Sequence, residues 1–158
     1  MVPEDVKQYI GKMDPPSVRG VEKGAIRRYA DAVGNDNPLY YDEAYASKSR
    51  YGSIIAPPGF FGWPTKPARS SAGLSEGIVT LQTALSKVGF SRILDGGISY
   101  DFYLPVRAGD VLVASLKIKD ITEKEGKSGT LVICNFETTY LNQNGDLVAK
   151  AYQTFIAR

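Results

Sequence analysis

The fold is decided near the C-terminus by three stretches: DVLVASLKIKDIT at residues 110–122, GTLVICNFETTYLN at residues 129–142 and LVAKAYQTFI at residues 147–156. They are rich in Val, Ile, Leu, Tyr, Phe and Thr, and the first alternates apolar with polar side chains, as half-buried β-strands do. Residues 142–146, between the last two stretches, contain an Asn-Gly pair typical of hairpin turns. A fourth apolar stretch covers residues 97–104. We therefore predict four strands in an antiparallel meander.

Upstream of the strands, apolar residues recur at helical spacing. Residues 21–33 place their apolar side chains three and four positions apart, which predicts one buried helical stripe. Gly34 is suited to end this helix, because glycine readily adopts the left-handed conformation of a helix C-terminus. Asp42 can cap a second short helix that ends near residue 48. The order of helices first and strands afterwards predicts an α+β fold with helix covering one face of the sheet.

The middle of the chain is less regular. Residues 60–63 carry Phe60, Phe61 and Trp63, which we predict to form a short helix that enters the core. Residues 65–77 are rich in Ser, Pro, Lys, Arg and Gly, which predicts a mobile loop. Residues 78–89 fit either a helix or a strand, since periodicity alone does not distinguish them. A sheet of this size keeps open edges, so we also expect at least a dimer.

Length and composition narrow the class of protein. A chain of 158 residues and 17.2 kDa fits one domain over residues 1–158. Nineteen Lys and Arg against seventeen Asp and Glu leave a net charge of +2, which predicts no nucleic-acid partner and no attraction to an anionic membrane. No segment approaches the roughly 18 apolar residues of a membrane span, and no signal-peptide pattern is present. We therefore expect a cytoplasmic protein.

The absence of histidine is the most informative count. With no His in the sequence, a Ser-His-Asp triad, a Cys-His dyad, a His-ligated zinc ion and a histidine general base are all excluded. The single cysteine, Cys134, lies in an apolar run and is predicted to be buried rather than nucleophilic. No acidic cluster has metal-ligand spacing and no phosphate-binding loop follows a strand. We therefore predict no metal and no cofactor.

Three motifs resemble one known family. The chain is similar to the MaoC-like hotdog proteins, which are (R)-specific enoyl hydratases and (3R)-hydroxyacyl thioester dehydratases, and to the branch that resembles the N-terminal dehydratase domain of type I fatty-acid synthases. The resemblance implies a hotdog fold, in which a curved antiparallel sheet wraps around a central helix. The motifs are RYADAVGNDNPLYYD at residues 28–42, YGSIIAP at residues 51–57 and PVRAGD at residues 105–110.

The active members of that family use a carboxylate and an imidazole on one water, and a backbone N–H that polarises the thioester carbonyl. Their motif reads Asp-x-Asn-Pro-hydrophobic-His. In this sequence Asn35 takes the Asp position, Asn37 keeps the Asn position and Tyr40 takes the His position. An amide does not titrate near neutrality and a tyrosine has a pKa of about 10. We therefore expect a site without either proton-transfer residue.

The remaining carboxylates and tyrosines near this turn have alternative interpretations. Asp36 and Asp42 either replace the lost base or stabilise the turn and cap the next helix. The tyrosines near the turn either line an acyl or pantetheine channel or are plain packing; they are Tyr40, Tyr41, Tyr45 and Tyr51. Lys23, Arg27 and Arg28 either meet coenzyme A phosphates or an acidic carrier protein, or form a solvated helix face.

The resemblance also implies a substrate-binding turn before the central helix. Its sequence is Ala56-Pro57-Pro58-Gly59, and Pro58 has no N–H, so Gly59 or Phe60 would supply the oxyanion donor. Together with Tyr41, the residues Ala56, Pro57, Gly59 and Phe60 are the candidate substrate-binding set.

Three functions remain open from the sequence. The first is the substrate-channel half of a hydratase or dehydratase dimer, binding acyl-CoA or acyl-carrier-protein thioesters in fatty-acid or acyl-CoA metabolism. Its partner would be a second copy or a hotdog subunit that carries the missing bases, since many family members are paired in this way. The second is a non-catalytic acyl-CoA binding protein. The third is a hotdog thioesterase, which needs a carboxylate but no histidine.

Overall fold

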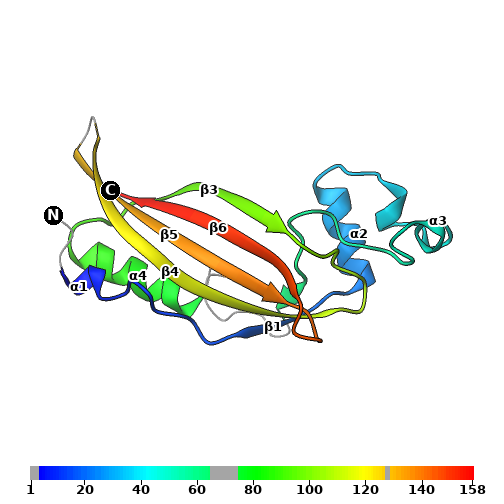
Figure 1. Cartoon of the computed structure of the whole chain (residues 1–158). Helices are drawn as coiled ribbons and strands as arrows, with labels where there is room; N and C mark the ends of the chain where they lie inside the picture. Colours follow the sequence, from blue (N-terminus) through cyan, green and yellow to red (C-terminus); the bar gives the residue numbers. More distant parts are fainter. Residues whose placement is uncertain (1–3, 65–74, 127–128) are drawn as a thin grey trace.

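The computed structural model describes residues 4–64, 75–126 and 129–158. Within these residues six strands form one curved antiparallel sheet in the order β2-β1-β4-β5-β6-β3 (Figure 1). The strands are β1 (Ser17–Gly20), β2 (Trp63–Pro64), β3 (Ile93–Phe102), β4 (Val111–Gly126), β5 (Gly129–Leu141) and β6 (Leu147–Ala157).

All four predicted strands are present, but they do not form a simple meander. Strands β4, β5 and β6 follow one another as neighbours, whereas β3 crosses over and pairs with β6, Ile98 opposite Gln153. The short strand β1 was not predicted. Its sequence, SVRG, is only half buried at one end and carries no alternating pattern, so only its pairing with β4 defines it as a strand.

Helix α4 (Glu76–Lys87) is the central helix, so the segment that fitted either a helix or a strand is helical. Ile78, Leu81 and Leu85 are buried along one stripe of α4 and pack against the sheet. Ser75 caps the helix, its Oγ accepting a hydrogen bond from Ile78 N at 3.4 Å. Figure 1 shows α4 and the short α1 (Glu4–Lys7) together on one side of the sheet. The fold is therefore the hotdog arrangement of class α+β.

The predicted helix at residues 60–63 is wrong. Pro58 and Gly59 form a turn, and residues 60–62 lead without regular structure into β2, whose Trp63 pairs with Gly20 of β1. Gly59 and Gly62 adopt φ values of +88° and +79°, and this left-handed conformation ends any helix. The two glycines, rather than the prolines, prevent the helix from forming.

Most of the predicted loop at residues 65–77 lies outside the described residues. Its last three residues, 75–77, contain the cap and the first turn of α4 rather than loop.

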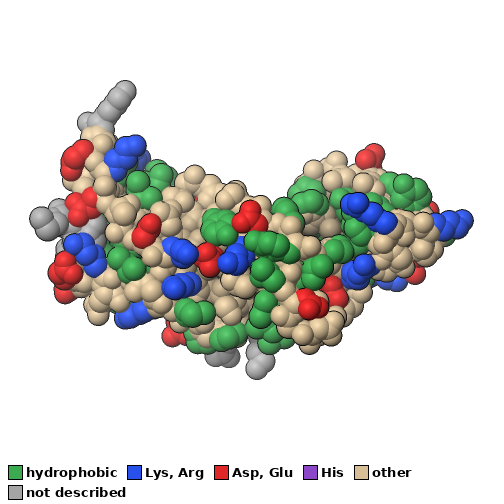
Figure 2. Space-filling view, viewed as in Figure 1, with side chains coloured by type: hydrophobic (Ala, Val, Ile, Leu, Met, Phe, Trp, Pro, Cys, Tyr) green, Lys and Arg blue, Asp and Glu red, His purple; other side chains and the backbone are tan. Residues whose placement is uncertain are grey.

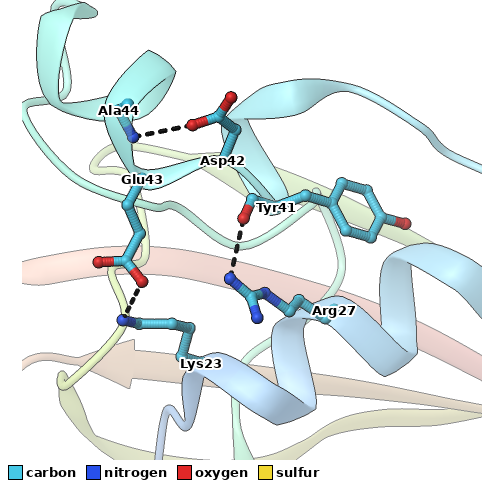
Figure 3. A network of polar contacts seen from close by, with 6 residues as sticks. All are labelled: Lys23, Arg27, Tyr41, Asp42, Glu43 and Ala44. Atoms are coloured by element: carbon cyan, nitrogen blue, oxygen red, sulfur yellow. Dashed lines mark hydrogen bonds and ion pairs between the residues drawn. The ribbon is translucent and has the colours of Figure 1, made fainter.

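The two predicted N-terminal helices are confirmed as α2 (Lys23–Ala32) and α3 (Glu43–Lys48), with the 3₁₀ helix η1 (Pro38–Tyr40) between them. Polar contacts join α2 to the segment that follows it (Figure 3). Lys23 Nζ lies 2.7 Å from Glu43 Oε1, and Arg27 donates to the Tyr41 carbonyl at 2.9 Å. Lys23 and Arg27 therefore fix the loop that carries the Asn-Pro motif.

The buried side chains form two clusters. One lies around α4 and contains Leu81, Phe136 and Phe155; the other lies between α2 and the opposite end of the sheet and contains Ile26, Phe61 and Leu112. No helix in the described part of the chain is long and apolar enough to cross a membrane.

Cys134 provides a test of the packing around α4. Its side chain is 1% exposed, and burial raises the pKa of its thiol from 9.0 to about 11, with the Asp120 charge adding to the shift. The neutral thiol is a poor nucleophile, so we expect iodoacetamide in mildly alkaline buffer to leave the folded protein unlabelled. The unfolded protein should take up one label, measured by mass spectrometry. Fast labelling of the folded protein would contradict the buried position.

Candidate substrate site

A cavity of about 590 Å³ lies beside the Asn-Pro turn. We call it the first cavity. Its walls come from the turn itself, from residues 55–61 and from residues 102–106, which follow directly from strand β3. Figure 2 shows hydrophobic side chains gathered where the sheet meets the part of the chain that holds α2 and α3. The first cavity is therefore formed by segments distant in the sequence.

Of the candidate residues, Asn37, Tyr40, Ala56, Pro57, Gly59 and Phe60 line the first cavity. The structure brings these six together from the Asn-Pro turn and from residues 56–60. Asn35, Asp36, Tyr41 and Asp42 belong to the same loop but are not among its lining residues.

Asn35 and Asn37 act on the backbone of the turn. Asn35 Oδ1 accepts a hydrogen bond from Asn37 N at 3.2 Å, and Asn37 Oδ1 accepts one from Leu39 N at 3.0 Å. These two contacts hold the turn before η1, as Asx turns do. Asn35 is thus a structural acceptor at the position where a base would stand.

Tyr40 is 7% exposed. Burial raises the pKa of its hydroxyl above the usual value, Tyr51 raises it further, and a side-chain hydrogen bond with Asn35 opposes the shift. The hydroxyl is therefore neutral near neutral pH, so it can donate a hydrogen bond to a ligand but does not accept a proton from water. Neither Asn35 nor Tyr40, the residues at the two motif positions, can therefore act as a base near neutral pH.

The carboxylates near the turn are engaged or exposed. Asp42 Oδ1 accepts hydrogen bonds from Ala44 N at 2.8 Å and from Tyr45 N at 3.0 Å, so it caps α3 (Figure 3). Asp36 is exposed on the loop. The Tyr41 hydroxyl lies 2.8 Å from Asp31 Oδ1, and partial burial, followed by the hydrogen bond and the charge of this carboxylate, raises its pKa. Tyr41 therefore links α2 to the turn.

The turn at residues 56–60 leaves one backbone donor. Ala56 N donates to the Val106 carbonyl at 2.8 Å and Phe60 N donates to the Pro57 carbonyl at 3.1 Å. No acceptor for Gly59 N–H is found in the described residues. Gly59 is therefore the candidate that remains of the two oxyanion donors.

Arg107 connects the third motif to the cavity wall. Its guanidinium donates hydrogen bonds to the Tyr51 carbonyl and, at 3.1 Å, to Ser53 Oγ. The backbone N–H of Arg107 donates to Asp110 Oδ2 at 2.7 Å. At the mouth, the Arg50 guanidinium lies 4.8 Å from the Tyr51 ring centroid, an exposed cation beside an aromatic face. The motif PVRAGD thus holds the YGSIIAP segment in place.

The wall formed by Phe102, Tyr103 and Leu104 was not foreseen as part of the site. These side chains are 52%, 52% and 42% exposed, although they are large and apolar. The sequence signal for this wall is the run of apolar residues just before Pro105. Such residues stay uncovered when a strand extends past the edge of its sheet.

The fold and this turn define a MaoC-like hotdog protein of the hydratase and dehydratase type. The chain belongs to the family described as FAS1-like, dehydratase domain region, whose model matches residues 9–151. It is 31% identical over 134 residues to a UPF0336 protein of Thermobifida fusca. The aligned segment covers 84% of this chain and 83% of that protein.

Two solved structures have the same fold. HadBC of Mycobacterium tuberculosis, a (3R)-hydroxyacyl-ACP dehydratase complex, is 25% identical with a TM-score of 0.66, over 94% of this chain and 96% of that one. A chain of the ChsH1-ChsH2 complex of the same organism is 16% identical with a TM-score of 0.76, over 97% of this chain and 86% of that one.

Proposed function

We propose that this protein is the substrate-channel subunit of an acyl-thioester hydratase or dehydratase and does not supply the proton-transfer groups. The observation that carries the proposal is the pair Asn35 and Tyr40, an amide and a buried neutral phenol at the two positions where the family has Asp and His. A water held there finds hydrogen-bond partners but no group that takes its proton near neutral pH.

The first cavity supports acyl-thioester binding. Its size of about 590 Å³ lies in the range of small-molecule sites. Phe60, Phe61 and Ile55 give it apolar walls for an acyl chain, whereas Gly59 N–H and the Tyr40 hydroxyl are polar groups suited to a thioester carbonyl. The exposed Arg50 at the mouth suits the phosphates of coenzyme A or of a carrier-protein arm.

The partner in this proposal pairs along strand β3. Leu94, Ile98 and Phe102 are each about half exposed on β3, which ends the sheet in the described residues. A strand added there satisfies the free backbone groups and covers these side chains. It also comes close to Phe102–Leu104, which form a wall of the first cavity. A catalytic subunit at this edge would therefore bring its Asp and His to the same substrate.

The test is hydration of crotonyl-CoA by the purified protein alone. We expect turnover at least about 10²-fold below that of a complete hydratase of this fold, because general acid-base catalysis contributes about 10²–10⁴ in rate. Calorimetric binding of the same thioester should remain. The decrease of the enoyl-thioester absorbance measures the rate.

Tyr40→Phe is the matched control, since it removes only the hydroxyl. The proposal predicts the same low rate for both proteins. Robust turnover by the wild-type protein that Tyr40→Phe abolishes would make Tyr40 a catalytic residue and reject the proposal. Absence of thioester binding, alone or with a co-purifying subunit, would reject the substrate class.

A further inference from the structure

A second cavity of about 330 Å³ lies on the inner side of the sheet, between β1 and the start of α4. A stacked ring pair separates it from the first cavity. Phe61 lines the first cavity, Tyr140 lines the second, and their ring centroids are 4.1 Å apart with an interplanar angle of 14°. A chain that fills the first cavity and turns the Phe61 ring aside enters the second.

Two partly buried charged side chains, Asp14 and Arg19, line the second cavity. One polar atom of each, Asp14 Oδ2 and Arg19 Nε, is buried and finds no hydrogen-bond partner among the described residues. The Asp14 carboxylate lies against the first turn of α4, where a Cβ on Gly77 would come within 2.0 Å of Asp14 Oδ1. Leaving buried polar atoms unsatisfied is unfavourable, so the pair is unusual for a site that only packs.

The side of the cavity that the sheet forms is lined by polar, uncharged side chains. Thr138, Tyr140 and Gln153 project into the cavity from β5 and β6, while Ile78 and Leu116 supply apolar surface. Arg19 also lies over the Tyr140 ring, with 5.9 Å between its Cζ and the ring centroid. The cavity therefore suits a chain of carbon atoms that ends in a polar group.

The two charges select the kind of polar group. A hydroxyl can donate its proton to Asp14 Oδ2 and accept from Arg19 Nε. A carboxylate would meet Arg19 but be repelled by Asp14 and Glu76, which also line the cavity. A carboxylate also has no donor for Asp14 Oδ2. An ammonium group would be attracted by the carboxylates, but it has no acceptor and would leave the Arg19 Nε donor unpaired. Of the hydroxyl, the carboxylate and the ammonium, only the neutral hydroxyl can both donate to Asp14 Oδ2 and accept from Arg19 Nε.

We propose that the substrate is an acyl thioester whose chain carries a hydroxyl group beyond Phe61, bound between Asp14 and Arg19. This inference rests on the proposed function, because the thioester end occupies the first cavity. It adds the class of acyl chain and the two residues that set the specificity. A site built to hydrogen-bond a substrate hydroxyl discriminates strongly against the analogue without it, because its buried polar groups are then left unpaired.

The experiment is calorimetric titration of the purified protein with coenzyme A thioesters of three kinds. The acyl chains run from hexanoyl to dodecanoyl, each unsubstituted, with a terminal hydroxyl or with a terminal carboxylate. At the chain length that reaches Asp14 and Arg19, we expect the hydroxylated thioester to bind at least about tenfold more tightly than the other two.

Variants assign the preference to the two residues. Arg19→Met and Asp14→Ala should reduce it to less than about threefold, because each removes one partner of the hydroxyl. Asp14→Asn should retain most of it, since the amide keeps an acceptor oxygen. Arg92→Met is the matched control, because Arg92 is exposed and lines neither cavity. Thermal melts accompany each titration to show that the variant is folded.

The outcomes separate this inference from the proposed function. Equal binding of hydroxylated and unsubstituted thioesters at every length overturns the inference and leaves the proposed function in place. A preference that persists in Arg19→Met and in Asp14→Ala, with both proteins folded, overturns the assignment to these residues. If no thioester binds to the wild-type protein, both proposals fail.

Discussion

The double variant Asn35→Asp with Tyr40→His should gain hydratase activity toward crotonyl-CoA by at least about 10²-fold over the wild-type protein, because it restores a general acid-base pair. The two side chains are already close, since the Asn35 amide opposes the rise in the pKa of the Tyr40 hydroxyl. The turn between them is held by Asn37, which caps η1 with its Oδ1 3.0 Å from Leu39 N. New bases at these positions would therefore face one shared water.

Single variants serve as controls for this gain. Asn35→Asp alone and Tyr40→His alone should each remain near the wild-type rate, because one group cannot both accept and deliver the proton in the family mechanism. The rate is measured with substrate in excess over the dissociation constant found by calorimetry. A folded double variant that binds thioester and shows no gain would mean that the turn does not present these positions to the substrate.

Gly62→Ala should destabilise the protein by about 3 kcal/mol, the largest stability effect we expect from a single added methyl group. A Cβ on Gly62 would lie 2.6 Å from the Gly20 carbonyl oxygen, and φ at this residue is +79°. The obstacle is backbone in β1, which cannot move without breaking its pairing with β2. For a chain of this length the midpoint of thermal unfolding should fall by about 6–12 °C.

Gly109→Ala separates the two causes of this effect. Gly109 has φ of +95°, but nothing lies within 4 Å of an added Cβ, so only the backbone strain of about 1 kcal/mol remains. The difference between the two variants measures the steric contact with Gly20. Equal melting temperatures would show that the close approach at Gly62 relaxes without penalty.

Alternation and turn chemistry predicted most of the sheet. Strands β4, β5 and β6 follow from runs of β-branched and aromatic residues, and the hairpin between β5 and β6 follows from its Asn-Gly pair. The position of β3 beside β6 was not predictable in this way, because strand order depends on packing across the sheet rather than on local pattern. The helix predicted at residues 60–63 does not form because Gly59 and Gly62 adopt left-handed backbone conformations, which the aromatic pattern does not reveal.

The candidate site was predictable only where a motif carried it. The Asn-Pro turn and residues 56–60 were identified from sequence, and the structure places them around one cavity. Asp14 and Arg19 belong to none of the motifs identified in the sequence. Their shared cavity arises because β1 pairs with β4 and thereby brings both residues under the sheet next to α4. Such a juxtaposition has no local signature.

The open edge of β3 has a consequence for production of the protein. Leu94, Ile98 and Phe102 are about half exposed in the single chain, and an uncovered apolar strand is a template for unwanted association. Under the proposed pairing, copies without a partner should therefore associate increasingly as their concentration rises, while dilute protein stays in solution. Co-expression with a partner that pairs along β3 should raise the yield of soluble protein.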